Sequence, residues 1–405
     1  MSRPANRDLR IIVAATALSS FGDAMALIAL TIRIHDTTGS GLAVSALLLA
    51  DLLPLIGLAP VTGMIVDRFE ARRVILWASV PQIAIAAGLA FATGLPQILG
   101  LVFLLGCGFA AAGPALATLI PHVVDEERIT EATAYVDVAR WVGLTVGPVV
   151  AGGLAASLGT RGALLIDSAS FAVLVAGVVA LHVRRAPAPS QEEGGWAQAR
   201  AGIRYLASDR LLRLCVLVLA AVILLVGGAN VAEVFFAKDV LHAGDAGYGV
   251  VAAAWTLGMA IGALVTGKRA PERSLAILLL LGMVVVGVST LLPALLPSLA
   301  LTIGAWFVGG IANGTGNVAL RSLVLHRVPE SVRGRVLAAI SGLFTAAQIV
   351  AMGLGGALVT AVGPRATLAI AAAGDLLASG AGLCLYARLA TGEDLEVPDA
   401  GEISS

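Results

Sequence analysis

The sequence predicts an all-α integral membrane protein with twelve transmembrane helices in two six-helix bundles. Three observations support this prediction. The 405 residues are 58% hydrophobic and only 13% charged, whereas soluble domains carry about 25% charged residues. Apolar stretches of about 20 residues, the length that a helix needs to cross the hydrocarbon core, recur along the chain. Lys and Arg are concentrated in alternate loops, as expected for loops held on the cytoplasmic side during insertion.

The apolar stretches predict helices because they do not alternate between polar and apolar residues, as barrel strands of about 10 residues do. The predicted spans are 11–32, 42–66, 74–94, 97–120, 133–158, 162–183, 212–236, 247–267, 274–295, 298–320, 336–361 and 366–387. Both chain ends fall on the side of the arginine-rich loops. We therefore predict cytoplasmic termini and a multi-pass protein of the cell (inner, cytoplasmic) membrane.

The first stretch follows Arg3, Arg7 and Arg10 and begins like a signal peptide. It continues through Asp23 to Ile32, which is too long for a cleaved signal, so we predict an uncleaved first helix. The later outer loops are short, and the inner loops carry the arginines.

The longest connection lies midway along the chain and divides it into two domains. We predict an N-terminal bundle over 1–183, a cytoplasmic linker over 184–211, a C-terminal bundle over 212–390 and a disordered tail over 391–405. The linker ends in an amphipathic stretch, which either lies on the membrane surface or forms part of a plain solvated linker. Its apolar side carries Trp196, Ala199, Ile203 and Leu206.

The second half of the sequence repeats the first at an offset of 204 residues. The matching pairs include Phe103 with Phe307, His122 with His326, Gly159 with Gly363 and Arg161 with Arg365. Six helices repeated in the same orientation imply two bundles related by a pseudo-twofold axis along the membrane normal. This is a transporter architecture, with the substrate site between the halves near the midplane.

Several charged residues fall inside the predicted spans, where each costs about 2.5–3.5 kcal/mol near a helix centre. We therefore expect them to face the bundle interior or a water-filled path. A buried carboxylate takes up a proton more readily, so these groups are proton-coupling candidates; static ion pairs or polar helix contacts are the alternative. Arg140 is the natural counter-charge for Asp137 or for another of these acids. The charged residues are Asp23, Asp51, Asp137, Arg140, Asp167, Glu233 and Asp375.

Uncharged polar and aromatic residues on the later helices are candidates for contact with substrate. A mostly apolar cavity with few polar groups suits a bulky hydrophobic ligand. Hydrogen bonding or packing between helices is the alternative for each residue. These candidates are Asn230, Trp255, Asn313, Asn317 and Gln348.

The loop between the second and third spans reads Gly63 to Arg73 and combines a glycine, an acid and several arginines. Gly63 permits close helix approach, and Asp67 is placed to face the positive end of a neighbouring helix. Arg68, Arg72 and Arg73 hold the loop at the cytoplasmic face. Positive-inside topology alone explains the arginines but not the Gly-x-x-x-Asp-Arg order.

The fifth span carries regularly spaced glycines around a proline. Gly143, Gly147 and Gly152 form a flat ribbon for close helix contact, and Pro148 kinks the helix. Generic helix packing would not require the proline.

These two motifs resemble those of the major facilitator superfamily. The signature loop departs at Glu70, where glycine is usual, and at Ala71, where arginine is usual. The resemblance implies that helices one and seven line the central cavity, so Asp23 and Glu233 are the leading candidates for proton coupling. Helices six and twelve are usually peripheral, so static roles are expected for Asp167 and Asp375.

Further features resemble the superfamily branch that exports macrolides, siderophores and other drug-like molecules. In the superfamily, the glycine–proline stretch of helix five marks proton-coupled antiporters; Ala151 here replaces one of its glycines. The arginine usual in helix four is missing. The features of this branch are Phe21-Gly22-Asp23, Thr38-Gly39-Ser40, Pro114-Ala115, Asp167 to Phe171, Gly202 to Leu206 and Arg333 to Val336.

The sequence and the resemblance together predict a proton-driven exporter of hydrophobic or amphipathic small molecules, working by alternating access as a monomer. The alternatives are a nutrient importer or uniporter of the same fold and a non-transporting membrane sensor. We expect protons, membrane lipids and a small-molecule substrate as partners. No enzyme activity, cofactor, metal site or nucleic-acid partner is expected, because phosphate-binding, metal-ligand and strongly basic patterns are missing from the sequence.

Overall fold

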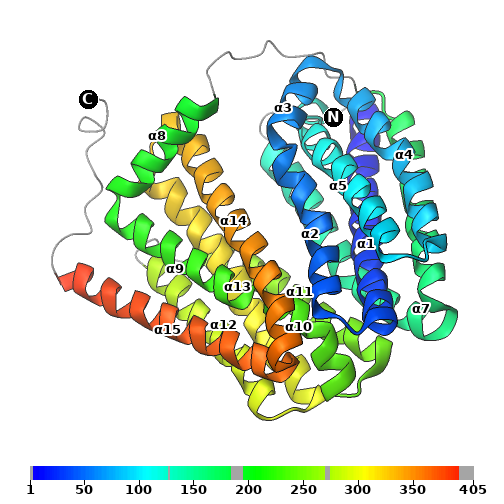
Figure 1. Ribbon diagram of the computed structural model, residues 1–405. Helices are drawn as coiled ribbons and strands as arrows, with labels where there is room; N and C mark the ends of the chain where they lie inside the picture. The colour runs from blue at the N-terminus through cyan, green and yellow to red at the C-terminus, as the bar shows by residue number, and fades with distance from the viewer. Residues whose placement is uncertain (1–2, 126–127, 184–194, 270–273, 392–405) are drawn as a thin grey trace. The chain divides into compact units, whose positions relative to one another are not determined.

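A computed structural model gives the fold, and it describes residues 3–125, 128–183, 195–269 and 274–391 (Figure 1). Helices are the sole regular secondary structure in these ranges. The helices are α1 (Arg3–Thr38), α2 (Gly41–Gly57), α3 (Ala59–Arg68), α4 (Ala71–Phe91), α5 (Leu95–Ala117), α6 (Ile120–Val123), α7 (Ile129–Val179), α8 (Gly195–Ser208), α9 (Arg210–Val226), α10 (Ala229–Phe235), the π-helix η2 (Phe236–Val240), α11 (Gly244–Arg269), α12 (Leu275–Leu295), α13 (Leu299–Arg327), α14 (Glu330–Val362) and α15 (Pro364–Thr391).

The protein is a multi-pass membrane protein. Nine helical segments in the described ranges are long and apolar enough to cross a membrane. One of them, α7, covers both predicted spans 133–158 and 162–183. The predicted spans 42–66 and 298–320 are not among the nine: α2 has only 17 residues before it ends, and α13 carries Asn313 and Asn317. The number twelve therefore stays a prediction.

Two predicted spans contain an irregular turn in the structure. Span 42–66 is divided at Leu58 into α2 and α3. Pro60 accounts for this break, because a proline in the first turn of a helix has no backbone N–H to continue the preceding helix. Span 212–236 has an irregular turn at Gly227 and Gly228, where glycine lowers the stability of a regular helix, but both residues keep helical dihedrals and Arg210–Val240 is long and apolar enough to cross as one segment. The first helix also runs beyond its prediction, to Thr38.

The chain forms two compact units, and each is described separately. Unit 1 comprises Met1–Gln191 and His242–Ala253. Its longest helix, α7, packs along α1 and α4, while α5 packs against α2 and α4; Figure 1 shows α2 and α5 side by side. A buried apolar cluster joins the helix ends that the sequence assigns to the cytoplasmic side, with Ile12, Ile75 and Leu119 at most 2% exposed.

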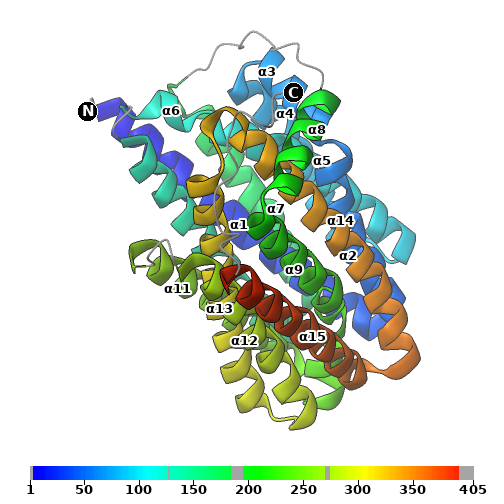
Figure 2. The same cartoon turned by 90° about the vertical axis from the view of Figure 1, so that its left-hand side faces the viewer.

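Unit 2 comprises Glu192–Leu241 and Ala254–Ser405. In it α12 packs against α13 and α15, and α9 packs against α14 and α15, as Figure 2 shows for α9, α14 and α15. Its core gathers buried residues of α9, α12, α13 and α14 around Leu212 and Cys215. The unit boundary differs from the predicted domains, because 242–253 belongs to unit 1.

Glycines with positive φ make the turns of the repeat. Gly159 (φ 71°) bends α7 at the predicted turn between spans, and its counterpart Gly363 (φ 83°) ends α14. This backbone region is open almost only to glycine. The two glycines stand 204 residues apart, so both halves use the same device.

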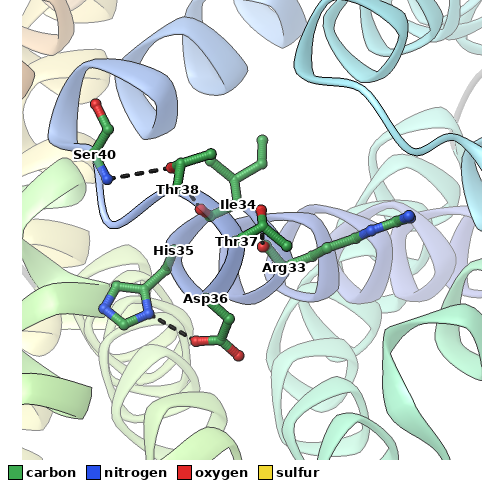
Figure 3. A network of polar contacts seen from close by, with 7 residues as sticks. All are labelled: Arg33, Ile34, His35, Asp36, Thr37, Thr38 and Ser40. Atoms are coloured by element: carbon green, nitrogen blue, oxygen red, sulfur yellow. Dashed lines mark hydrogen bonds and ion pairs between the residues drawn. The ribbon is translucent and has the colours of Figure 1, made fainter.

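The turn from α1 to α2 is held by short-range hydrogen bonds (Figure 3). The hydroxyl of Thr38 donates to the Ile34 carbonyl oxygen at 2.7 Å and accepts from the amide of Ser40 at 3.2 Å. Gly39 between them has φ 58°. The Ser40 hydroxyl then caps α2 by accepting from the amide of Ala43. This geometry explains why Thr38-Gly39-Ser40 is required here.

The predicted amphipathic stretch is the helix α8. Tyr205 is only 2% exposed, and Gly202 is buried against the carbonyl oxygen of Arg335 on α14. Ile203, expected on the apolar face, is 57% exposed. α8 packs against α14 and α9 on its buried side, and the membrane-surface position of its other side stays a prediction. The side chains of Trp196 and Ala199, much of the linker and the tail after 391 lie outside the described residues.

Candidate functional site

Three carboxylates of unit 1 lie within electrostatic range of one another, on three different helices. Asp23 of α1 is close enough to both Asp167 of α7 and Asp51 of α2 to sense their charges. Asp167 is 1% exposed, and the other two are partly buried. In the described part of the chain, none of the three forms an ion pair with Lys, Arg or His. The burial of Asp167 and of Oδ1 of Asp23 fits the expectation that these two charges face the bundle interior, and for Asp51 it stays a prediction.

The closest contact in this group joins α1 and α7. A Cβ atom on Gly22 would collide with Oδ1 of Asp167 and with Oγ of Ser170. The Ser170 hydroxyl donates to the Asp167 carbonyl oxygen at 2.7 Å and lies 3.4 Å from Oδ1. Oδ1 of Asp23, the next residue after Gly22, is buried and has no hydrogen-bond partner among the described residues. A buried polar oxygen without a partner is costly unless it binds a proton.

Asp137 and Arg140 form the predicted pair. Arg140 Nη2 lies 3.1 Å from Asp137 Oδ1, one helical turn along α7. Both side chains are about half exposed on unit 1. The pair therefore differs from the buried carboxylates, because the charge of Asp137 is already balanced by that of Arg140.

Unit 2 contains two further carboxyl groups with at least one buried oxygen that lacks a hydrogen-bond partner among the described residues. Oε1 of Glu233 on α10 is buried and has no hydrogen-bond partner in the described ranges. Asp375 on α15 is 0% exposed, and both of its side-chain oxygens are buried without a hydrogen-bond partner among the described residues. A Cβ on Gly287 of α12 would lie 3.1 Å from Asp375 Oδ2. The expected static ion pair or polar contact of the Asp375 carboxyl is not present among these residues, which corrects that interpretation.

The substrate-cavity candidates all lie in unit 2, but they have different surroundings. Asn230 on α10 is exposed. Asn317 Nδ2 donates to the carbonyl oxygen of Asn313 at 3.0 Å and to its side-chain oxygen at 2.9 Å, so these two satisfy each other along α13. Trp255 packs against Gly309 and the core cluster, and Gln348 lies near Gly227, at the break between α9 and α10. Its packing contacts favour the packing alternative for Trp255, and Asn313 and Asn317 contact each other.

The glycines of the fifth span make the close contacts that the sequence predicts. A Cβ on Gly143 would lie 2.5 Å from the Ala17 carbonyl oxygen, and one on Gly147 would lie 2.7 Å from the Phe21 carbonyl oxygen, both on α1. Gly152 packs against the Asp245 carbonyl oxygen, in the part of α11 that belongs to unit 1. Pro148 is buried within the same α7 segment. This ribbon is what brings α1 against α7.

The signature loop is tied to the end of α7 by one arginine. Arg72 Nη2 donates to the Val179 carbonyl oxygen at 2.5 Å, and Arg73 Nε lies 3.2 Å from Glu70 Oε2. Arg68 is exposed, and the side chain of Asp67 lies outside the described residues. Gly63 is exposed with nothing within 4 Å of a Cβ position. The predicted close helix approach at Gly63 is therefore not seen in unit 1.

Two buried aspartates at the ends of the units were not predicted. Oδ2 of Asp8 accepts from the amides of His182 and Val183, at 3.0 and 2.9 Å, where α7 ends. Asp209 is 0% exposed; it caps α9 through the amide of Leu212 and pairs with Arg327. The signal for Asp209 was its place before an apolar helix, which is typical of an N-cap. The pairing with Arg327, a distant residue in sequence, had no such signal.

Tyr205 completes the group around Arg327. Its hydroxyl donates to the Arg327 carbonyl oxygen at 2.6 Å. Burial raises the pKa of Tyr205 above its ordinary value, and the charge of Asp209 adds to this rise while Arg327 opposes it. The group fixes α8 to α9 and α13 at one end of unit 2.

With this geometry in place, comparison with known proteins identifies the family. The model of the transmembrane secretion effector family, part of the major facilitator superfamily, matches residues 4–402. The chain belongs to this family. The superfamily resemblance inferred from the two motifs is thereby confirmed. The relatives and the solved structures described next are transporters.

Relatives of this secretion effector family match along most of their length. The uncharacterized MFS-type transporter YfiS of Bacillus subtilis is 25% identical over 389 residues, 93% of either chain. The multidrug efflux pump Tap of Mycobacterium tuberculosis is 27% identical over 379 residues, 88% of either chain. The enterobactin exporter EntS of Escherichia coli is 27% identical over 340 residues, covering 81% of this chain and 78% of EntS.

Solved structures share the fold at low identity. A variant of the nucleoside transporter NupG matches with a TM-score of 0.79 at 12% identity, over 94% of this chain and 100% of NupG. A POT family transporter in complex with a thioalcohol conjugated peptide matches with a TM-score of 0.76 at 14% identity, over 95% and 96% of the two chains. These likenesses show that the chain shares the fold of these structures.

Proposed function

We propose that this protein is a secondary active transporter that exports a hydrophobic or amphipathic small molecule, such as a drug-like compound, macrolide or siderophore, by proton antiport. The description of the family as secretion effectors supports export. Relatives named as a multidrug efflux pump and an enterobactin exporter support this substrate class. The glycine–proline stretch around Pro148 supports antiport, because it resembles the stretch of proton-coupled members.

The observation that carries the proposal is the state of Asp23 and Glu233. Each has a buried carboxyl oxygen without a hydrogen-bond partner among the described residues, one in unit 1 and one in unit 2. A carboxylate removed from water and from any cation is most easily accommodated when protonated. These two groups therefore take up protons on one side of the membrane and release them on the other. One charge that moves through 100 mV supplies about 2.3 kcal/mol, or roughly forty-fold accumulation.

The proposed architecture is that of the sequence prediction: twelve helices in two six-helix bundles that rock about a central site as a monomer. The 204-residue repeat and the matched turns at Gly159 and Gly363 support it. Asn230, Asn313, Asn317 and Gln348 are the residues proposed to meet the substrate. Asp51 and the Asp137–Arg140 pair are secondary candidates in coupling.

In this mechanism the cytoplasmic loop closes the inner side of the transporter, with both termini on that side of the cell membrane. Asp67 and Arg68 act at the loop, and the bond from Arg72 to the Val179 carbonyl oxygen fixes it to α7. Arg73 is held by Glu70. These contacts support a rigid loop that moves together with unit 1.

The test combines a growth screen with vesicle transport. A sensitive bacterial strain that produces the protein is challenged with varied toxic compounds, including ethidium and a macrolide, with and without an uncoupler. We expect resistance to at least one compound that the uncoupler removes. In everted membrane vesicles, the same compound should accumulate when the interior is acidic. Uptake in the opposite direction would favour the nutrient importer, and binding without flux would favour a sensor.

A further inference from the structure

The surroundings of Asp167 do not fit the static role expected for a residue on a peripheral helix. It is 1% exposed, and its Oδ1 sits directly against Gly22, the residue before Asp23. Its hydrogen bonds in the described ranges come from Ser170 on the same helix. A static ion pair would require a cation, and none among these residues pairs with Asp167 or with Asp23. The charge of this region must therefore be neutralised in another way.

We propose that Asp167 is a second proton-coupling residue, which forms with Asp23 a pair that takes up and releases protons as one unit. This inference rests on the proposed function and goes beyond it, since that function assigns the coupling of unit 1 to Asp23. Asp51 of α2 is the third charged group that faces Asp23. Two carboxylates that share a low-dielectric site are not both ionised, because their charges repel.

The helix contact provides the link to conformational change. Asp23 lies on α1 and Asp167 on α7, and these helices meet closely through Gly22, Gly143 and Gly147. A small displacement of α1 against α7 changes the distance between the two carboxyl groups and therefore their repulsion. Protonation of the pair and the packing of the two helices are thus coupled within unit 1, independently of any substrate.

The experiment follows the protonated carboxyl groups of the full-length protein in lipid nanodiscs by infrared difference spectroscopy during a pH titration. The variants are Asp23→Asn, Asp167→Asn and the double variant, which change charge but not size. We expect each single variant to move the half-intensity pH of the remaining carboxyl band down by at least about one unit, because a neighbouring negative charge is gone. The double variant should lose the part of the band that belongs to this pair, while the part from the other buried carboxyl groups, including Glu233 and Asp375, remains.

Two further variants separate charge from packing. Ser170→Ala removes a hydrogen-bond donor to Asp167 without changing charge, so the half-intensity pH should move up. Glu131→Gln, which removes an exposed carboxyl at the start of α7, should leave the titration as in the wild type. The pairing would be overturned if Asp23 and Asp167 titrated independently. In that case the half-intensity pH of the carboxyl group that remains in each single variant would equal its wild-type value.

Transport is measured separately in everted vesicles with ethidium or the compound found by the growth screen. If the pair titrates as described but no compound is moved, the proposed function fails and the pair stands. If transport is proton-driven but its pH profile is unchanged in Asp167→Asn, the pair fails and the proposed function stands. A purely structural role of Asp167 would lower the rate at every pH and leave the profile in place.

Discussion

Arg327 Nε lies 2.7 Å from Oδ2 of Asp209, and this ion pair is almost completely buried in unit 2, with side-chain exposures of 11% and 0%. The other oxygen of Asp209 caps α9 at the amide of Leu212. The carbonyl oxygen of Arg327 accepts from Tyr205 on α8. One buried charge pair therefore connects three helices at the end of the linker.

Arg327→Met should destabilise the protein by about 3–5 kcal/mol, because it leaves Asp209 buried without a counter-charge. Equilibrium unfolding in mixed detergent micelles measures the change, with labelling of the buried Cys215 thiol as the probe of unit 2. Arg321→Met on the exposed side of α13 is the matched control. An equal loss in both variants would show that the ion pair contributes nothing special.

Tyr205→Phe should cost about 1 kcal/mol through the lost hydrogen bond to Arg327. It should also change the response to alkaline pH. The pKa of Tyr205 is raised in the folded protein, so its stabilisation is complete below the unfolded pKa of about 10 and is lost as pH rises through the folded value. Unfolding free energies from pH about 8 to 11 measure this. Tyr386→Phe, at the edge of the same core, is the control: its unfolding free energy should fall with rising pH as much as that of the wild type.

Alanine at Gly159 or at Gly363 should destabilise its own unit by about 1–3 kcal/mol, because φ is 71° and 83° at these positions. The two variants are predicted to behave alike, since the repeat places the glycines at equivalent turns. Thermal unfolding with a separate probe in each unit measures both. Gly153→Ala, a helical glycine with open space around it, should be neutral or slightly stabilising. A harmless Gly363→Ala would refute the argument from backbone conformation.

Gly143→Ala tests the close packing of α1 on α7. The added methyl group would lie 2.5 Å from the Ala17 carbonyl oxygen, so α1 must move and the cost should be about 1–3 kcal/mol. We also expect slower transport, because the same helices carry Asp23 and Asp167. The paired measurement is unfolding and ethidium efflux, with Gly153→Ala on the same helix as the reference. Unchanged packing and transport would mean that α1 and α7 do not need this contact.

Features set by local sequence could be predicted, and features set by long-range packing could not. Apolar length gives the helices, and the repeat locates the turns at Gly159 and Gly363, because both depend on nearby residues. Pro60 was a visible signal for the break at Leu58 that the span prediction did not use. The pairing of Asp209 with Arg327, 118 residues away, depends on how α9 and α13 pack, and hydropathy carries no information on that.

The candidate site divides in the same way. The sequence identifies Asp23, Asp167, Glu233 and Asp375 as charges too costly to face lipid, and the structure buries at least one oxygen of Asp23 and Glu233 and both oxygens of Asp375. The neighbours of these groups were not predictable. A peripheral helix suggested a static role for Asp167, but its contact with Gly22 depends on the rotation of α7, which hydropathy does not determine.

The most direct test of the central claim is pH-driven transport by the purified protein in proteoliposomes, with ethidium or the compound selected by the growth screen. An imposed proton gradient should drive accumulation by the wild type and by the Glu131→Gln control. Asp23→Asn and Glu233→Gln should insert normally and still exchange substrate between the two sides, yet lose gradient-driven accumulation. Full gradient-driven accumulation in both variants would contradict proton coupling through these two carboxyl groups.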